Sequence, residues 1–450
     1  MKRDSIDFAS EPVGSLFRQM LFPTLAGMIS IVVLNITDGA FIGKGVGSNG
    51  IASVNIAAPI FTFITGLGMM FGGGSSIVAS IHLSKGNTKA ARINITQALG
   101  ASLIIGILFG ALILFNLETT ARLFGSNEVL LPQVSAYIKW IALTLPLNLL
   151  GIVGEYIIRL DGSPKYAMAC TVTAAALNIF LDWLFIFPFG WGVEGAAKAT
   201  GISFAVSGVM ALIYMCFFSR TLHLYRLKTS LTSLKLTLRN LGYQIKVGFS
   251  SLLGETAVSC SLIAGNYVFI RYLGENGVAA FSVACYCIPT AFMLANAITQ
   301  SAQPIISFAY GTADNLRMKK ARNLALATGL IAGVAGFAAL CFAAKPITAV
   351  FLHESDPAFA LSVSGLPWYS AVSIFICINV VLIGYLQSIE QARKAVIFTL
   401  LRGFIFVIPS FIFLPQLLGT HGLWLALPLA EALTTVIIVM TPEGQTPWGH

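Results

Sequence analysis

Residues 51–84 read IASVNIAAPIFTFITGLGMMFGGGSSIVASIHLS and contain no Asp, Glu, Lys or Arg. The run is longer than the roughly 20 residues that a helix needs to cross a bilayer, and far longer than the roughly 10 residues of a barrel strand. Polar and apolar residues do not alternate along it, as they would in such a strand. Only helices and closed barrels satisfy the backbone inside hydrocarbon, so the run predicts a membrane-spanning helix.

The rest of the chain has the same character. Its 450 residues are 56% hydrophobic and only 10% charged, with a mean hydropathy of +0.84. Soluble domains carry about 25% charged residues, so the composition predicts an all-α integral membrane protein of about twelve transmembrane helices. The predicted helices span residues 15–43, 51–84, 92–116, 131–160, 165–188, 194–219, 241–273, 278–311, 318–343, 363–390, 393–415 and 420–440.

The two ends of the helices differ in charge. The N-terminal residues MKRDSIDFASEP contain three acidic residues and no cleavage site, so we expect the first helix to be retained. Basic residues gather in the loops after even-numbered helices, for example Lys85, Lys89 and Arg92. The positive-inside rule then places both termini in the cytoplasm. The net charge of +9 lies in such short clusters, so nucleic acid is not an expected partner.

The two halves of the chain repeat at an interval of about 227 residues. Three matches occur in order, namely FI at 41–42 and 269–270, KAAR and KKAR at 89–92 and 319–322, and GxxGxxxA at 192–199 and 419–426. Because six helices is an even number, both halves have the same orientation, and they predict two pseudo-symmetric six-helix lobes.

The repeat also predicts the domain organisation. We expect an N-terminal lobe at residues 1–220, a cytoplasmic connector at 221–240, a C-terminal lobe at 241–440 and a disordered tail at 441–450. Two lobes that face each other across a central cavity suit a secondary transporter, in which one lobe rocks against the other around a site near the midplane.

Ionisable residues inside hydrocarbon are costly and are therefore candidates for function. Asp38 lies near the end of the first predicted helix. Asn178 and Asp182 lie four residues apart in the fifth, which places both side chains on one helix face. With the hydroxyl of Thr200 from the next helix, these oxygens suit a small hard cation. The alternative is a hydrogen-bonded clamp between helices.

The polar residues are not repeated in the second half. Asp38, Asn178 and Asp182 correspond there to Asn266, Ile405 and Pro409. A purely structural role would have favoured matching residues, so the asymmetry indicates function. In the C-terminal lobe, Glu255 and Glu431 are the intramembrane carboxylates and are candidates for receiving a substrate or a proton.

Other polar and small residues carry less information. Lys139, Glu155, Lys198 and Arg402 lie close enough to helix ends to snorkel to the membrane surface. The glycines between Gly66 and Gly74 predict close helix packing, because no phosphate-binding lysine follows them. We find no nucleophile, base or metal-ligand constellation, so neither an enzyme nor a cofactor is expected.

Four motifs resemble those of the MATE family of multidrug and toxic compound exporters, and most closely its bacterial DinF/MepA-like branch. They are TDGAFIG at 37–43, DGSPK at 161–165, LNIFLD at 177–182 and GVEGAAKAT at 192–200. The resemblance covers nearly the whole chain. It implies two lobes around a V-shaped cleft, and antiport of organic cations against Na⁺ or H⁺ across the bacterial inner membrane.

The resemblance also implies site residues. The family's cation site falls on Asp38, Asn178, Asp182, Thr200 and the carbonyl of Ala196. Some members add a carboxylate in the seventh transmembrane helix, which Glu255 matches in position. Lys198 departs from the family pattern, because it places a charge where the family usually has an apolar residue. Small organic cations and membrane lipid are the expected partners, and the protein is expected to be a monomer. The alternative is a flippase for a lipid-linked saccharide of the same wider superfamily.

Overall fold

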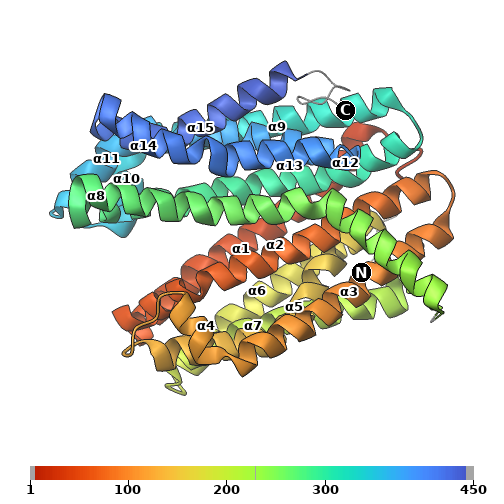
Figure 1. The fold of residues 1–450 in the computed structure, drawn as a ribbon, viewed down its shortest axis with the longest axis horizontal. Helices are drawn as coiled ribbons and strands as arrows, with labels where there is room; N and C mark the ends of the chain where they lie inside the picture. The colour runs from red at the N-terminus through yellow and green to blue at the C-terminus, as the bar shows by residue number, and fades with distance from the viewer. Residues whose placement is uncertain (1–5, 229, 442–450) are drawn as a thin grey trace. The chain divides into compact units, whose positions relative to one another are not determined.

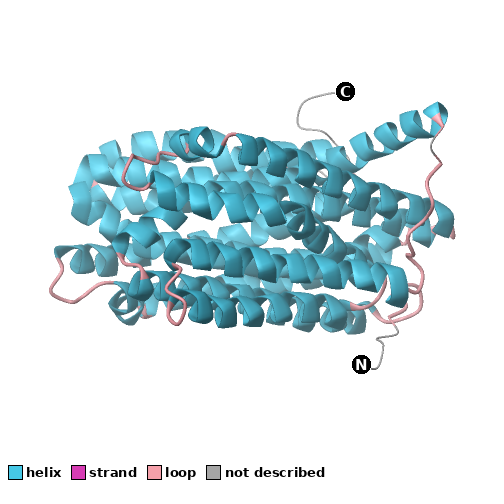
Figure 2. Ribbon diagram, turned by 90° about the horizontal axis from the view of Figure 1, so that it is seen from below, coloured by secondary structure: helices cyan, strands magenta, loops and turns pink. Residues whose placement is uncertain are grey.

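The computed structural model describes residues 6–228 and 230–441, and these residues form helices and loops without a strand (Figure 1, Figure 2). Ten helices are long and apolar enough to cross a membrane, and α11 with α12 forms one further span that is bent by 46°. One of the ten, α8 (Leu231–Gly311), merges two helices across Gly274, whose φ of 64° is left-handed. Counting those two separately, the described residues agree with the prediction of about twelve spans.

The chain divides into two compact units. The first comprises Met1–Leu252 and Ser307–Asn315, and the second comprises Leu253–Ile306 and Leu316–His450. The lobe and connector boundaries at 220 and 240 stay a prediction. The predicted tail 441–450 lies outside the described residues, except for Thr441.

The first unit holds most of the N-terminal half. Its helices are α1 (Val13–Gly45), α2 (Ser48–Ser84), α3 (Thr88–Phe115), the short α4 (Leu117–Leu123), α5 (Leu131–Leu160), α6 (Pro164–Ile186), α7 (Gly192–Ile213), the π-helical turn η1 (Tyr214–Phe218) and the first part of α8. Local sequence sets the ends of these helices. The Asn87 side chain caps α3 by accepting from the Ala90 N–H at 3.2 Å. Gly162, at φ 81°, ends α5, and Pro164 then begins α6.

Small residues let the helices of the first unit approach closely. A Cβ at Gly208 of α7 would collide with the backbone carbonyl of Leu147 in α5. Within α2, a Cβ at Gly68 would meet Ile152, and one at Gly74 would meet the backbone of Gln244. The prediction that the α2 glycines serve helix packing is therefore confirmed.

The outward surface of this unit is apolar. On α3, Ile107, Leu108 and Leu112 are 52%, 62% and 59% exposed, although the most hydrophobic window of this helix has a mean hydropathy of 2.6. Water would not tolerate such a surface, whereas lipid favours it. The chain is therefore a multi-pass membrane protein.

The second unit holds the remainder of α8 and the C-terminal helices. These are α9 (Asn315–Phe342), the short α10 (Ala344–Phe351), α11 (Pro357–Tyr369), α12 (Val372–Ser388), α13 (Ala392–Leu400), the π-helical turn η2 (Leu401–Ile405), α14 (Val407–Leu418) and α15 (Thr420–Met440). Aromatic rings fill its core. Phe269 stacks on Phe281 with ring centroids 4.4 Å apart and meets Trp424 edge-on at 5.0 Å.

The structure adds three features to the predicted helices. The short helices α4 and α10 were not predicted, and their first residues, Leu117 and Ala344, are separated by the same interval of about 227 residues as the other repeats. α8 begins ten residues before the predicted start at 241, because Ser230 caps it. The span predicted at 363–390 is bent. At the bend the Ser370 hydroxyl donates to the Pro367 carbonyl at 2.6 Å, and it competes there with the backbone N–H groups of the helix for that carbonyl.

Candidate functional site

The structure brings Asp38, Asn178, Asp182 and Thr200 together inside the first unit. Asp38 comes from α1, the next two residues from α6 and Thr200 from α7. Asn178, Asp182 and Thr200 are only 1%, 0% and 6% exposed, and Asp38 is half-buried. The carboxyl groups of Asp38 and Asp182 are in hydrogen-bonding contact. The four side chains that the sequence selected thus form one cluster.

The Asn178 amide joins two parts of this cluster. In the orientation that satisfies both of its polar atoms, Nδ2 donates to Asp182 Oδ2 at 3.0 Å. Oδ1 then accepts from the Thr200 hydroxyl at 3.2 Å and from the Thr200 backbone N–H at 3.1 Å. The reverse orientation would place the amide oxygen against the carboxylate, so the hydrogen bonds assign the first orientation. Ala196 is fully buried one helical turn before Thr200.

Tyr137 of α5 is a residue of this cluster that the sequence analysis missed. Its side chain is 2% exposed, its hydroxyl contacts Thr200, and it lies near Asp38 and Asp182. A tyrosine within an apolar run looks like a core aromatic, and only the position of its hydroxyl separates the two roles. The cluster therefore draws on four helices, α1, α5, α6 and α7.

The two carboxyl groups lack a complete set of partners. Asp38 Oδ1 and Asp182 Oδ1 are buried without a hydrogen bond. Within the described residues, no Arg, Lys or His forms an ion pair with either group. Two carboxylates in contact repel each other, so the pair needs a shared proton or a bound cation. Carboxylate, amide and hydroxyl oxygens are the ligands that a small hard cation takes. The described residues hold no group of three His, Cys, Asp or Glu of the kind that binds transition metals.

Lys198 does not compete for this site, because its charge is engaged elsewhere. Its Nζ lies 3.0 Å from Glu194 Oε1, one turn earlier on α7. The same nitrogen lies over the rings of Trp191 and Trp140, at 4.3 Å and 5.1 Å from their centroids. The departure from the family pattern therefore places no ion pair of Lys198 on Asp38 or Asp182.

The candidates of the second unit are arranged differently. Glu431 of α15 is bound by Arg402, whose Nε donates to Oε1 at 3.0 Å and whose Nη2 donates to the same oxygen at 2.7 Å. The amide of Asn379 donates to Glu431 Oε2 at 2.7 Å. Both charged residues are 4% exposed. The expectation that Arg402 snorkels to the membrane surface is wrong, because η2 holds it inside the unit against a buried partner.

Glu255 lies near the same guanidinium but forms no hydrogen bond with it. A cavity of about 10 Å³, enough for about one water molecule, borders Arg402 and Glu431. The second unit therefore places two carboxylates around one fixed cation. Glu155 of the first unit is also paired, since it accepts from Arg159 Nη2 at 3.1 Å and from Thr171 at 2.8 Å.

Comparison with known proteins gives consistent matches. The profile of the MatE family matches residues 23–184 and 251–413, which together make up more than half of the chain and repeat the two halves. The multidrug export protein MepA of Staphylococcus saprophyticus is 26% identical over 438 residues, covering 94% of each chain. MepA of Staphylococcus aureus is 23% identical over 437 residues, covering 96% of this chain and 94% of the relative.

Solved structures share the fold. A MOP superfamily transporter from Pyrococcus furiosus, described as having a binding pocket of reverse polarity, matches with a TM-score of 0.87 at 22% identity. A MATE crystallised in complex with MaL6 matches with a TM-score of 0.87 at 23% identity. Both comparisons cover 96% of this chain and 95% of the other.

Proposed function

Because this chain belongs to the MatE family, we propose that it exports small organic cations, drugs among them, across a bacterial plasma membrane in exchange for Na⁺ or H⁺. The bacterial relatives are multidrug export proteins, which supports this cargo and this membrane. The positive-inside distribution of Lys and Arg supports cytoplasmic termini.

The contact between Asp38 and Asp182 carries the proposal. Each carboxyl keeps one buried oxygen without a partner, and no described basic side chain pairs with either. A cation or proton taken from one side of the membrane satisfies these oxygens, and its release restores the repulsion between the carboxylates. Asn178 and Thr200 hold neutral oxygens beside the pair, with the Ala196 carbonyl as the proposed fifth ligand.

The coupling of ion and cargo follows from the difference between the carboxylate pair with a bound cation or proton and the same pair without one. Loading the pair removes a charge repulsion that would otherwise act between α1 and α6, so the two loading states favour different positions of these helices. Rocking of the two lobes around a central cavity then exposes the site, and the cargo, to alternate sides. Glu255 and Glu431 are the proposed proton or substrate carboxylates of the second unit.

The test is efflux of a fluorescent lipophilic cation from proteoliposomes under separately imposed Na⁺ and H⁺ gradients. Asp38→Asn removes one charge of the pair with little change of shape, and it should abolish gradient-driven efflux. Glu275→Gln, at an exposed position beside Gly274, is the matched control and should transport like the wild type. The gradient that drives efflux identifies the coupling ion.

Two outcomes contradict the proposal. Full transport by Asp38→Asn would remove the carboxylate pair from the coupling step. Absence of transport under both gradients, in folded protein, would favour the flippase of a lipid-linked saccharide, which translocation of a labelled lipid analogue in the same proteoliposomes would then detect.

A further inference from the structure

The first turns of α8 lie before the span that hydropathy predicts at 241–273, and Ser230 caps them. From Leu231 to the break at Gly274, α8 runs for roughly 65 Å. The hydrocarbon core of a bilayer is about 30 Å thick, so a helix of this length extends beyond the core. The extension is the start of α8, because the predicted span begins ten residues later. The positive-inside rule favours the cytoplasmic surface for this start.

One side of this start is fixed to α3 by polar side chains. Gln97 of α3 donates through Nε2 to the Thr237 hydroxyl at 2.9 Å. Gln244 donates through Nε2 to Asn94 Oδ1, also of α3, at 2.8 Å. Thr237 and Gln244 lie seven residues apart, and two turns of helix return them to the same face. These bonds therefore determine which side of the helix faces α3 and which side faces outward.

The outward side carries three exposed leucines. Leu231, Leu234 and Leu238 are 78%, 55% and 62% exposed, and their spacing of three and four residues aligns them along one helix face. We call them the leucine stripe. A row of exposed leucines at the end of a membrane-spanning helix is unfavourable in water and favourable among acyl chains.

A basic row follows the leucine stripe along one edge. Lys235 and Arg239 each come directly after a leucine of the stripe, and Lys246 lies seven residues beyond Arg239. All three are exposed, and none of them forms an ion pair within the part of the chain that the structure describes. Residues 219–252 contain no Asp or Glu. The outward side therefore combines an apolar stripe with an uncompensated basic row, which is the pattern of a helix that lies in a membrane surface.

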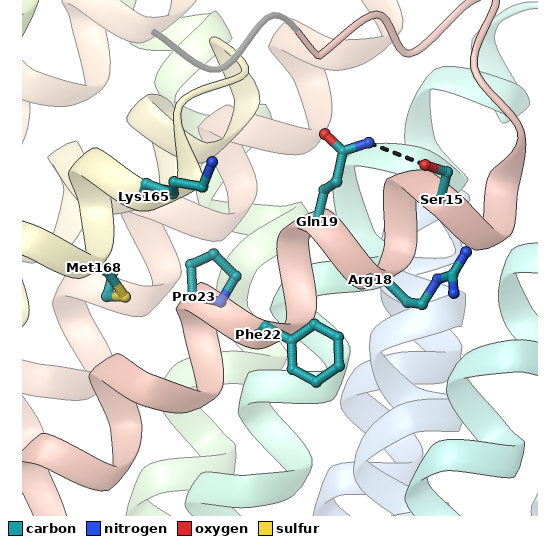
Figure 3. Close-up of a pocket in the computed structure, with 7 residues that line it drawn as sticks. All are labelled: Ser15, Arg18, Gln19, Phe22, Pro23, Lys165 and Met168. Carbon is teal, nitrogen blue, oxygen red and sulfur yellow. Dashed lines mark hydrogen bonds between the residues drawn. The ribbon is translucent and has the colours of Figure 1, made fainter. Parts of the chain in front are cut away.

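A cavity of about 600 Å³ in the first unit lies elsewhere, along the beginnings of α1 and α6 (Figure 3). Its lining comes from those two helices, with Arg18 of α1 among it, and includes no residue of α8. The leucine stripe is therefore separate from this cavity. Arg18 is an exposed basic residue of the same unit that does not belong to the basic row, so it provides a charge control.

We propose that the start of α8 lies in the cytoplasmic surface of the membrane as an amphipathic helix, with the leucine stripe among the acyl chains and the basic row at the phosphates of anionic lipids. Charge selects this partner, because anionic lipids attract cytoplasmic clusters of Lys and Arg. A second copy of the chain would bring the same basic row against itself, which is repulsive. The helix then fixes the segment between α7 and α8 at the membrane surface, whatever cargo the protein exports.

The test is hydrogen–deuterium exchange of the full chain in nanodiscs that hold one copy, made of phosphatidylcholine alone or of phosphatidylcholine with phosphatidylglycerol. Contact with the anionic lipid should slow exchange of the backbone amides of residues 231–241. Lys235→Gln with Arg239→Gln should lose about thirtyfold of this protection, since each basic side chain near an anionic surface contributes about fivefold. Exchange of α5 should stay the same in every variant, which shows that the protein remains folded.

Two controls separate the basic row from charge in general. Arg18→Gln with Lys85→Gln removes two exposed charges of the same unit outside the basic row, and it should keep the lipid-dependent protection. Lys235→Arg with Arg239→Lys keeps both charges of the row and should also keep the protection.

The leucine stripe has a matched pair of variants on the same helix. Leu238→Gln removes one leucine of the stripe, whereas Leu236→Gln removes a leucine that is 45% exposed and lies about 200° away around the helix axis. Leu and Gln have similar helix propensities, so neither change alters the helix by itself. Leu238→Gln should speed exchange in both kinds of nanodisc, and Leu236→Gln should not.

Three outcomes contradict the proposal. Equal exchange of residues 231–241 in both kinds of nanodisc would overturn it, as would an equal loss of protection in the variant Arg18→Gln with Lys85→Gln. Equal effects of Leu238→Gln and Leu236→Gln would exclude the leucine stripe from the membrane contact. Protection that arises only in nanodiscs holding two copies would show that the stripe binds a second chain instead of lipid.

Discussion

Replacement of Arg402 by Met should destabilise the protein strongly, because it leaves Glu431 buried without its cation. The Arg402 guanidinium makes bonds of 2.7 and 3.0 Å to Glu431 Oε1, and both residues are 4% exposed. After the substitution, the Asn379 amide, at 2.7 Å, is the remaining donor to the carboxylate within residues 6–228 and 230–441. Removal of one partner from a buried ion pair costs about 3–5 kcal/mol, and we expect a loss of that size.

The double variant Arg402→Met with Glu431→Leu should be more stable than Arg402→Met alone. It replaces the whole pair by apolar groups, and such replacements are often neutral or stabilising. We expect a recovery of at least about 2 kcal/mol. Glu255 loses the nearby guanidinium in both variants, so its contribution cancels in the comparison.

The assay is reversible unfolding of the purified protein in mixed micelles as the fraction of SDS is raised, which gives the free energy of unfolding. Arg122→Met is the control, because it breaks the Arg122–Glu128 ion pair on the exposed surface of the first unit and should change little. If Arg402→Met costs less than about 1 kcal/mol, the range of an exposed ion pair, the burial argument is refuted. A double variant less stable than Arg402→Met would refute the pairing argument.

Four further variants, one of them a control, test other parts of the structure. Gly208→Ala should cost about 1–3 kcal/mol in the SDS titration, because the new Cβ meets the Leu147 carbonyl, whereas Gly100→Ala, with nothing within 4 Å of its Cβ, should gain about 0.5–1 kcal/mol. A loss at both glycines would contradict the packing argument. Lys198→Met should leave gradient-driven efflux within about twofold of the wild type, since its ion pair lies away from the cluster, and faster efflux would instead indicate that its charge competes with the coupling ion. Tyr137→Phe should slow efflux about fivefold, as expected for one lost hydrogen bond of about 1 kcal/mol, at unchanged protein levels, and full activity would exclude its hydroxyl from the site.

Hydropathy predicted the spans because lipid imposes a strong constraint on every buried backbone group. It could not find the short helices α4 and α10, which have seven and eight residues and cannot cross a bilayer. It also could not find the bend between α11 and α12, where the Ser370 hydroxyl donates to the Pro367 carbonyl. Features set by single contacts leave no trace in an average over many residues.

In the candidate site, too, the sequence identified some residues and missed another. Asp38, Asn178, Asp182 and Thr200 were found because polar oxygens are rare in apolar helices, and the structure brings them into one cluster. Tyr137 was missed because its ring is compatible with any core position.

Arg402 was misjudged because a long side chain near a helix end often reaches water. Its burial depends on Glu431, which is 29 residues away in the chain, and no local pattern reports that pairing.

The short helices α4 and α10 have a consequence for the internal repeat of the chain. They begin at corresponding points of the two halves, although neither crosses the bilayer and neither supplies a residue to the carboxylate pair. The repetition of this short helix indicates that it belongs to the six-helix unit that the chain contains twice. The positions of the second half that correspond to Asp38 and Asp182 hold Asn266 and Pro409, so the two halves share the short helix but differ in the chemistry of these positions.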